Sequence, residues 1–200
     1  MKDLGELKYF FGIEFVRSSQ GLLLHQRKYT LELISELVLG AAKPAATPLE
    51  LNVKLTTQGY NEHTSTINNL DDALLSDATR YQRLLGKLLY LTVIRPDIVF
   101  SVQTLSQFMQ KPKKSHMEAT LRVIIYVKNH PGQGVLLSSQ KKGVISGFCD
   151  ADWEACPLTR KSVTGFFIKY GDSLILCKSK GKVQFVEALQ NQSIEALPRH

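Results

Sequence analysis

Apolar and polar positions change period along this chain, and the first stretch has the pattern of extended structure. Leu7–Val16 is apolar with few breaks, Ser18–Gly21 is rich in turn-forming residues, and Leu22–Gln26 is apolar again. Two apolar runs separated by a short turn predict a β-hairpin. The period then becomes helical over Lys28–Leu39, and Gly40 is expected to end that helix.

A polar segment without a sustained period follows, over residues 41–76. It contains two prolines and the acidic pair Asp71 and Asp72. Connections of this length are usually functional or disordered. We expect an extended linker that docks locally around Leu49–Leu55.

Three helices are expected next. The first, Asp77–Val93, ends before Pro96 because the residue preceding a proline is pushed out of helical geometry, and the second is Asp97–Gln110. Ser115–Glu118 fits a capping box at the start of the third helix, which His130–Gly132 closes. Apolar side chains recur at helical spacing in all three, so each helix has an apolar face.

From Gly134 onward the period returns to two, which predicts strands. The strands of this expected meander are Val135–Ser138, Val144–Cys149, Ser162–Tyr170 and Leu174–Ser179, with a tight turn at Gly171–Asp172. Val183–Leu197 has helical propensity but an irregular apolar stripe. The complete pattern predicts an α+β chain, in which a β-hairpin is followed by a helical region and an antiparallel meander.

Composition places the chain among soluble globular proteins, with 200 residues, 44% hydrophobic and 22% charged. No apolar run approaches the roughly 18 to 20 residues of a membrane span, and the N-terminus lacks a signal-peptide pattern. We therefore expect no membrane association and an intracellular location in the cytoplasm or nucleus. Cys149, Cys156 and Cys177 are widely spaced, which favours reduced thiols over disulfides or zinc.

The net charge of +7 is concentrated in the middle of the chain. Between Ile98 and Phe148, Glu118 is the single acidic residue among seven basic ones. Those seven are Lys111, Lys113, Lys114, Arg122, Lys128, Lys141 and Lys142. Such a segment either holds the phosphates of a nucleic acid through counterion release or is a solvated lysine-rich face. Composition leaves both interpretations open.

Gly147–Trp153 has the pattern of an apolar strand that ends in two carboxylates, Asp150 and Asp152. Carboxylates at the end of a strand can bind a divalent metal ion, and two-metal phosphodiester chemistry needs several such oxygens. The alternative is that the two aspartates open a polar turn. Taken alone, the residue types favour the turn.

Several motifs together resemble the Pol polyprotein of copia-type retrotransposons. The motifs are Asp3-Leu-Gly-Glu-Leu-Lys-Tyr9, Phe11-Gly-Ile-Glu14, His25-Gln-Arg-Lys-Tyr29, Tyr81-Gln-Arg-Leu-Leu-Gly86, Arg95-Pro-Asp-Ile98, Leu105-Ser-Gln-Phe-Met109 and Asp150-Ala-Asp-Trp153. They follow the family's order and spacing over residues 1–182. The resemblance implies the C-terminal part of a reverse transcriptase followed by the start of a ribonuclease H domain.

The resemblance also implies a division of the chain. Residues 1–40 would be the end of the palm, with the hairpin that supports a primer terminus, and the first thumb helix. Residues 41–76 would be a linker, 77–134 the helical thumb and connection, 135–182 a partial ribonuclease H-like domain, and 183–200 a divergent tail. Asp150 would be a ribonuclease H acid and a ligand of Mg²⁺.

The chain departs from the family where catalysis is concerned. It lacks the Tyr-Val-Asp-Asp turn of the polymerase, and Asp71-Asp72 lies in the linker, so this pair is no substitute. Near the C-terminus, Asn191 and Ser193 stand where the family's helix carries two glutamates. Back-translation of the tail permits a family-like helix in another reading frame, so we hypothesise a frameshift near Gly181.

Three functional hypotheses follow. The first is a fragment of a reverse transcriptase and ribonuclease H polyprotein without autonomous catalysis. The second is a nucleic-acid-binding remnant that grips an RNA–DNA duplex through its basic helical region. The third is residual Mg²⁺-dependent ribonuclease H activity that uses Asp150 with Asp152 or Glu187. The sequence leaves the oligomeric state open.

Overall fold

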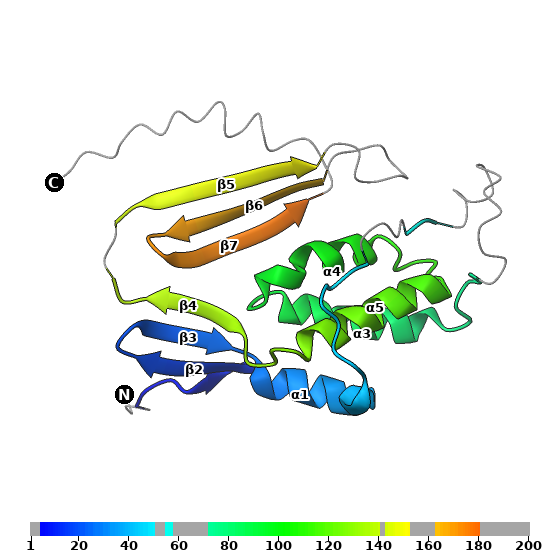
Figure 1. Ribbon diagram of the computed structural model, residues 1–200, viewed down its shortest axis with the longest axis horizontal. Coiled ribbons are helices and arrows are strands. Elements are labelled where there is room, and N and C mark those ends of the chain that lie inside the picture. The colour runs from blue at the N-terminus through cyan, green and yellow to red at the C-terminus, as the bar shows by residue number, and fades with distance from the viewer. Residues whose placement is uncertain (1–4, 51–54, 58–71, 141–142, 153–162, 181–200) are drawn as a thin grey trace.

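The computed structural model describes residues 5–50, 55–57, 72–140, 143–152 and 163–180, and for 150–152, 163–164 and 180 it describes only the backbone. Within these residues the chain is α+β, as expected. Two antiparallel sheets lie on one side of a helical region (Figure 1). The helix expected at Val183–Leu197 falls outside the described residues.

The first sheet combines the N-terminal hairpin with a strand from much later in the sequence. Its strands are β1 (Tyr9–Phe10), β2 (Ile13–Ser18), β3 (Gly21–His25) and β4 (Gly134–Ser138). The order is β1-β2-β3-β4, and every neighbouring pair is antiparallel. The prediction that β4 begins the C-terminal meander was therefore wrong: its period of two was identified correctly, but its partner is β3.

Two glycines allow β3 and β4 to approach closely. Gly21 pairs with Ser138 at one end of the ladder, and Gly134 pairs with His25 at the other. A Cβ atom added to Gly21 would clash with the carbonyl oxygen of Leu137, and one added to Gly134 would clash with the carbonyl oxygen of Leu24. These positions exclude side chains because the partner backbone occupies the space.

The helical region lies between β3 and β4 in the sequence. Its helices are α1 (Arg27–Glu36), α3 (Ala78–Leu91), α4 (Val99–Ser106) and α5 (Lys114–Val127), with 3₁₀ turns η1 (Leu39–Ala41) and η2 (Pro96–Ile98). Helix α1 ends earlier than expected, because Val38 takes a left-handed conformation with φ of 55° before Gly40 is reached. Pro96 occupies the first turn of η2, where its missing N–H costs nothing.

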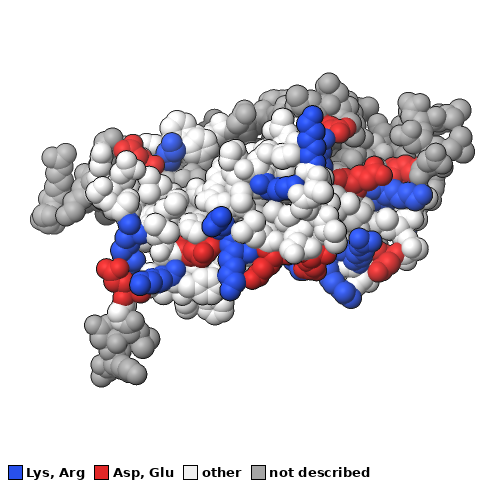
Figure 2. All heavy atoms as spheres, turned by 60° about the horizontal axis from the view of Figure 1, so that its bottom comes forward, with Lys and Arg blue, Asp and Glu red and all other residues white. Residues whose placement is uncertain are grey.

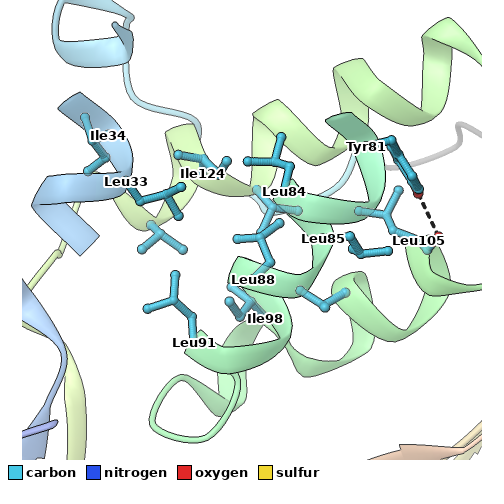
Figure 3. Packing of buried hydrophobic residues seen from close by; sticks show 13 residues of the cluster. Leu33, Ile34, Tyr81, Leu84, Leu85, Leu88, Leu91, Ile98, Leu105 and Ile124 are labelled. Carbon is cyan, nitrogen blue, oxygen red and sulfur yellow. Dashed lines mark hydrogen bonds between the residues drawn. The ribbon is translucent and has the colours of Figure 1, made fainter. Parts of the chain in front are cut away.

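One hydrophobic core joins these helices (Figure 3). The apolar face expected from the sequence is the buried face of α3, whereas α5 buries Val123 together with Ile124 and Val127 and leaves Met117 and Leu121 only partly buried. The buried members are Leu33, Ile34, Tyr81, Leu84, Leu85, Leu88, Leu91, Ile98, Val102, Leu105, Val123, Ile124 and Val127. Tyr81 satisfies its hydroxyl group by donating a hydrogen bond to the carbonyl oxygen of Leu105 at 2.7 Å. Leu49 and Leu55 pack against this core, which confirms local docking of the linker.

The start of α5 differs from the predicted capping box. The helix begins at Lys114, and the Nδ1 atom of His116 accepts a hydrogen bond from the backbone N–H of Lys113 at 3.1 Å. Asp72 accepts two more, from the backbone N–H and the hydroxyl group of Ser115, both at 2.9 Å. The cap therefore combines His116 of the helix itself with a linker carboxylate, in place of the capping box that the sequence predicted at Ser115–Glu118.

The second sheet contains β5 (Ile145–Asp152), β6 (Val163–Tyr170) and β7 (Ser173–Lys180) in the order β5-β6-β7. The predicted tight turn is present, and Gly171 has a positive φ of 57°. The hydroxyl group of Ser173 accepts a hydrogen bond from the backbone N–H of Ser138 at 2.8 Å, which connects β7 to β4. The antiparallel meander is confirmed for these three strands, while its ribonuclease H-like identity stays a prediction.

Candidate nucleic-acid interface

The Arg95-Pro96-Asp97 motif forms a buried ion pair. The guanidinium of Arg95 donates from Nε to Oδ1 of Asp97 at 2.9 Å and from Nη2 to Oδ2 at 2.7 Å. It also donates from Nη1 to the carbonyl oxygen of His130 at 2.9 Å. Burial favours a higher pKa for the Asp97 carboxyl, but the hydrogen bonds and charge of Arg95 outweigh it, so this pKa lies below its usual value. The motif therefore has a structural role, since it ties the turn before α4 to the loop after α5.

Lys113, one of the seven predicted phosphate contacts, is buried. Lys113 is 2% exposed, and its Nζ lies 3.6 Å from Oδ2 of Asp72. Burying an ammonium without a partner would be costly, and the carboxylate of Asp72 provides that partner. A lysine held in this way does not reach a ligand at the surface, so we correct the prediction and exclude Lys113 from the interface.

Arg122 and Lys128 face the linker. Arg122 donates to Oε1 of Glu50 at 2.8 Å and to the hydroxyl oxygen of Thr47 at 3.3 Å. The Nζ of Lys128 donates to three backbone carbonyl oxygens, those of Leu39 at 3.2 Å, Ala42 at 2.7 Å and Gly40. These two cations hold residues 39–50 against α5. Their positive charges are therefore already bound by oxygen atoms of the same chain.

The remaining predicted contacts divide into two groups. Lys111 and Lys114 are exposed on either side of Lys113. Lys141 and Lys142 lie outside the described residues. The space-filling view shows basic and acidic side chains alternating over the face it presents (Figure 2). On that face, among the described residues, the cations do not gather into a patch of one sign.

Asp150 lies near the end of β5, where its backbone pairs with Gly165 of β6. Its side chain is not described, so its role as a metal ligand stays a prediction. Among the described residues, no cluster of three or more His, Cys, Asp or Glu side chains is arranged to hold a metal ion.

A second candidate surface was not predicted from the sequence. Tyr9 and Phe10 form β1, and Phe11 begins the turn that leads to β2. These three residues, which we call the aromatic turn, are 55%, 54% and 77% exposed. The rings of Phe10 and Phe11 meet edge to face with centroids 4.5 Å apart. The sequence placed all three in a strand, although successive strand residues face opposite sides and three consecutive aromatics cannot share one core.

Contacts with helices α3 and α1 fix the backbone of the aromatic turn. Phe11 has a φ of 46° and Gly12 a φ of 73°, a left-handed pair that turns the chain sharply. The hydroxyl group of Tyr90 in α3 donates a hydrogen bond to the carbonyl oxygen of Phe11. The Tyr90 ring meets the Tyr29 ring edge to face at 5.0 Å. Helix α3, which contacts α1 through the Tyr90 and Tyr29 rings, therefore fixes the backbone of the turn, while the rings of the turn itself stay exposed to solvent.

Cations lie beside the aromatic turn. Lys8 and Lys28 are exposed, and the Nζ of Lys28 lies 6.0 Å from the centroid of the Tyr9 ring. The backbone N–H of Lys28 donates to Oε2 of Glu14 at 3.0 Å, which anchors the start of α1 on β2. Stacking rings next to basic side chains are the combination that holds single-stranded nucleic acid.

Comparison with known proteins identifies the family. The chain is 36% identical over 180 residues to the retrovirus-related Pol polyprotein from transposon RE2 of Arabidopsis thaliana, covering 90% of this chain and 12% of that protein. It is 34% identical over 180 residues to an uncharacterized mitochondrial protein of the same plant, covering 70% of that protein. The chain belongs to the family of copia-type retrotransposon Pol polyproteins, which confirms the resemblance.

Further comparisons set the extent of this relationship. The Pol polyprotein from transposon TNT 1-94 of Nicotiana tabacum is 30% identical over 183 residues, covering 90% of this chain and 13% of that protein. The chain thus spans about an eighth of the length of the Pol polyproteins it matches. No family profile and no solved structure matches it. None of the described helices is long and apolar enough to cross a membrane.

Proposed function

We propose that this chain is a nucleic-acid-contacting segment of a transposon Pol polyprotein and that it has no catalytic activity by itself. The observation that carries the proposal is the aromatic turn. Three large rings stay exposed although their burial would be favourable by roughly 1.5–3 kcal/mol each. Exposed aromatic clusters of this kind mark binding surfaces.

Stacking explains why nucleic acid is the preferred ligand. Each base has a π-face, and base stacking on an aromatic side chain contributes about 1–3 kcal/mol per base. The edge-to-face pair of Phe10 and Phe11 offers ring faces in two orientations. Lys8 and Lys28 provide positive charge for the adjoining phosphates. The basic residues Lys111 and Lys114 would add electrostatic attraction.

The absence of autonomous catalysis rests on the acids that this chain contains. Asp71-Asp72 is its only adjacent aspartate pair. Asp72 is used as the cap of α5 and as the partner of Lys113. Asp150 would bind Mg²⁺ without the glutamates that Asn191 and Ser193 replace, and a partly coordinated Mg²⁺ is held weakly because it loses water reluctantly.

Fluorescence anisotropy with a labelled single strand and a labelled RNA–DNA hybrid tests the proposal. Phe10→Leu and Phe11→Leu keep apolar bulk but remove the rings, so we expect each to weaken binding about fivefold or more. Val93→Ala, which changes a 61% exposed residue after α3, is the matched control and should bind like the wild type. Equal affinities for the wild type and both ring variants would reject the aromatic turn as the binding surface.

The salt dependence of the same titration tests the charge contribution. The logarithm of the affinity should fall linearly with the logarithm of the salt concentration, because bound phosphates release counterions. Lys114→Ala should make that slope shallower by about one. Arg122→Ala should leave the slope unchanged, since its guanidinium is already paired with Glu50. No affinity at low salt would reject nucleic-acid binding altogether.

A further inference from the structure

Arg122 of α5 does not use all the donors of its guanidinium group. Its Nη1 donates to Oε1 of Glu50 at 2.8 Å, and its Nη2 donates to the hydroxyl oxygen of Thr47 in a longer contact of 3.3 Å. Its Nε is buried and, among the described residues, has no hydrogen-bond partner. Most buried polar atoms in folded proteins do have a partner, so this nitrogen requires an explanation.

Arg95 shows how the same two nitrogens bind an anion elsewhere in this chain. Its Nε and Nη2 donate to the two carboxylate oxygens of Asp97, at 2.9 and 2.7 Å. Guanidinium groups form such paired hydrogen bonds with carboxylates and with phosphates. In Arg122, Nη2 meets only the neutral hydroxyl group of Thr47, and Nε meets no described partner. This side of Arg122 is therefore suited to an oxyanion at the position of that hydroxyl group.

Thr47 lies in a sequence that can supply such an anion. Proline follows it, and Thr47 is the only serine or threonine of the chain that precedes a proline. Proline-directed protein kinases phosphorylate a serine or threonine at this position. The proline also favours an extended backbone at the residue before it.

The segment around Thr47 is accessible from solvent. Residues 42–50 form neither a helix nor a strand, and they cross α5 at the surface, with Lys43, Ala46 and Glu50 exposed (Figure 1). Thr47 itself is half-buried. The hydrogen bonds from α5 and the residues after it to this segment come from side chains, so a kinase can lift the segment without breaking a helix or a sheet.

We propose that Thr47 is a phosphorylation site for a proline-directed protein kinase and that Arg122 binds the resulting phosphate. The kinase transfers the γ-phosphoryl group of ATP to Oγ1 of Thr47. The bond from phosphorus to Oγ1 forms, the bond from phosphorus to the leaving ADP breaks, and the hydroxyl proton passes to the kinase. Phosphothreonine has a charge of about −1.5 to −2 and three acceptor oxygens, so Nε and Nη2 can both donate to it.

The phosphate would strengthen the attachment of residues 42–50 to α5. A neutral contact of 3.3 Å is replaced by charge-assisted hydrogen bonds, which are shorter and roughly twice as strong. Glu50 keeps its own donor, Nη1, so the two anions use different nitrogens of Arg122. The phosphates of a nucleic acid do not reach the buried Nε, and this site is therefore independent of the proposed nucleic-acid binding.

Incubation of the full chain with ATP and a proline-directed kinase tests the modification. Mass spectrometry of the digested product should find one added phosphoryl group, at Thr47. Thr47→Ala should stay unmodified, and Pro48→Ala should react at least tenfold more slowly. A full chain that stays unmodified at Thr47 would overturn the proposal.

Phosphorus NMR of the modified chain tests the contact with Arg122. The second pKa of phosphothreonine is normally about 6, and donors to the doubly ionised form lower it. This pKa should be lower in the wild type than in Arg122→Gln, by about 0.5 or more. Arg122→Lys keeps the charge without the paired donors, so its value should lie between the two. Equal values in the wild type and Arg122→Gln would rule out Arg122 as the phosphate ligand.

Limited proteolysis measures the effect on the segment. Phosphorylation should slow cleavage within residues 42–50 at least threefold in the wild type and leave the rate in Arg122→Gln unchanged. Each protein is compared with its own unphosphorylated form, so any loss of stability caused by the substitution does not affect the comparison. Arg17→Gln, which changes an exposed arginine of β2, is the control and should respond like the wild type. Unchanged or faster cleavage of the phosphorylated wild type would overturn the proposal.

Discussion

Asp97 neutralises the guanidinium of Arg95 at a place where the arginine is 2% exposed. The two residues are close in the sequence, yet the pair fixes contacts between distant parts of the helical region through the carbonyl oxygen of His130. Removal of either group would leave the other charge in the interior without its partner.

Asp97→Ala should therefore be among the most destabilising single substitutions in the chain. Breaking a buried ion pair costs about 3–5 kcal/mol, because an uncompensated charge remains. Urea denaturation of Asp97→Ala, Arg95→Leu and the double variant measures this cost. The double variant should lose less stability than the sum of the two single losses. Additive losses would show that the two charges do not interact.

The stability of the fold should fall in mild acid because of His116. Burial lowers its pKa from 6.5 to about 4, so the folded state binds this proton more weakly than the unfolded state does. The contribution is fully present above about pH 6.5 and is lost as pH falls towards 4, up to about 3 kcal/mol. Urea denaturation from pH 7 to pH 4 measures the loss.

The matched variants for this pH dependence are His116→Gln and His130→Gln. The first keeps a polar side chain beside Phe108 but does not titrate, so its stability should vary less with pH. The second changes an exposed histidine and should follow the wild type. If His116→Gln and the wild type lose stability in parallel, the buried imidazole is not the cause.

Lys128 should control how firmly the linker is held. Lys128→Met keeps much of the apolar stem but removes the donors to Leu39, Gly40 and Ala42. Loss of hydrogen bonds from a charged donor should cost about 1–3 kcal/mol. Limited proteolysis should cut residues 39–50 faster in this variant. Lys114→Met, on the exposed side of α5, should change neither quantity, and equal cleavage in all three proteins would contradict the role of Lys128.

Ribonuclease H activity should be absent. With a labelled RNA–DNA hybrid and Mg²⁺, the wild type and Asp150→Asn should both cleave no faster than buffer, because the metal lacks its other ligands. Cleavage that requires Mg²⁺ and disappears in Asp150→Asn would establish residual catalysis. Such a result would leave the binding role of the aromatic turn intact, since that surface lies elsewhere in the chain.

Local patterns predicted the helices well. The spacing of Tyr81, Leu84, Leu85 and Leu88 identifies the buried face of α3, because side chains that repeat at the helical period lie on the same side of the helix and pack against the core together. Asp77 caps α3 through the backbone N–H of Thr79 at 2.8 Å, at the position where the helix was expected to begin. Such features depend on residues a few positions apart.

Features that depend on distant residues were not predicted. Part of the cap of α5 comes from Asp72, which lies 43 positions before Ser115. The burial of Lys113 follows from that same carboxylate. The exposure of the aromatic turn follows from the support of Tyr90 in a later helix. Composition counts these side chains but does not assign their partners, so it overestimated the basic surface and missed the aromatic one.

The pairing of β3 with β4 has a consequence for synthesis. His25 and Gly134 are partners although more than a hundred residues separate them. During translation the edge of β3 therefore stays unpaired until the whole helical region and β4 have been synthesised. Closing so long a loop is slow, and an open strand is prone to misassembly in the interval. The strands of the hairpin are therefore synthesised before β4 but complete their sheet only after β4 has been synthesised.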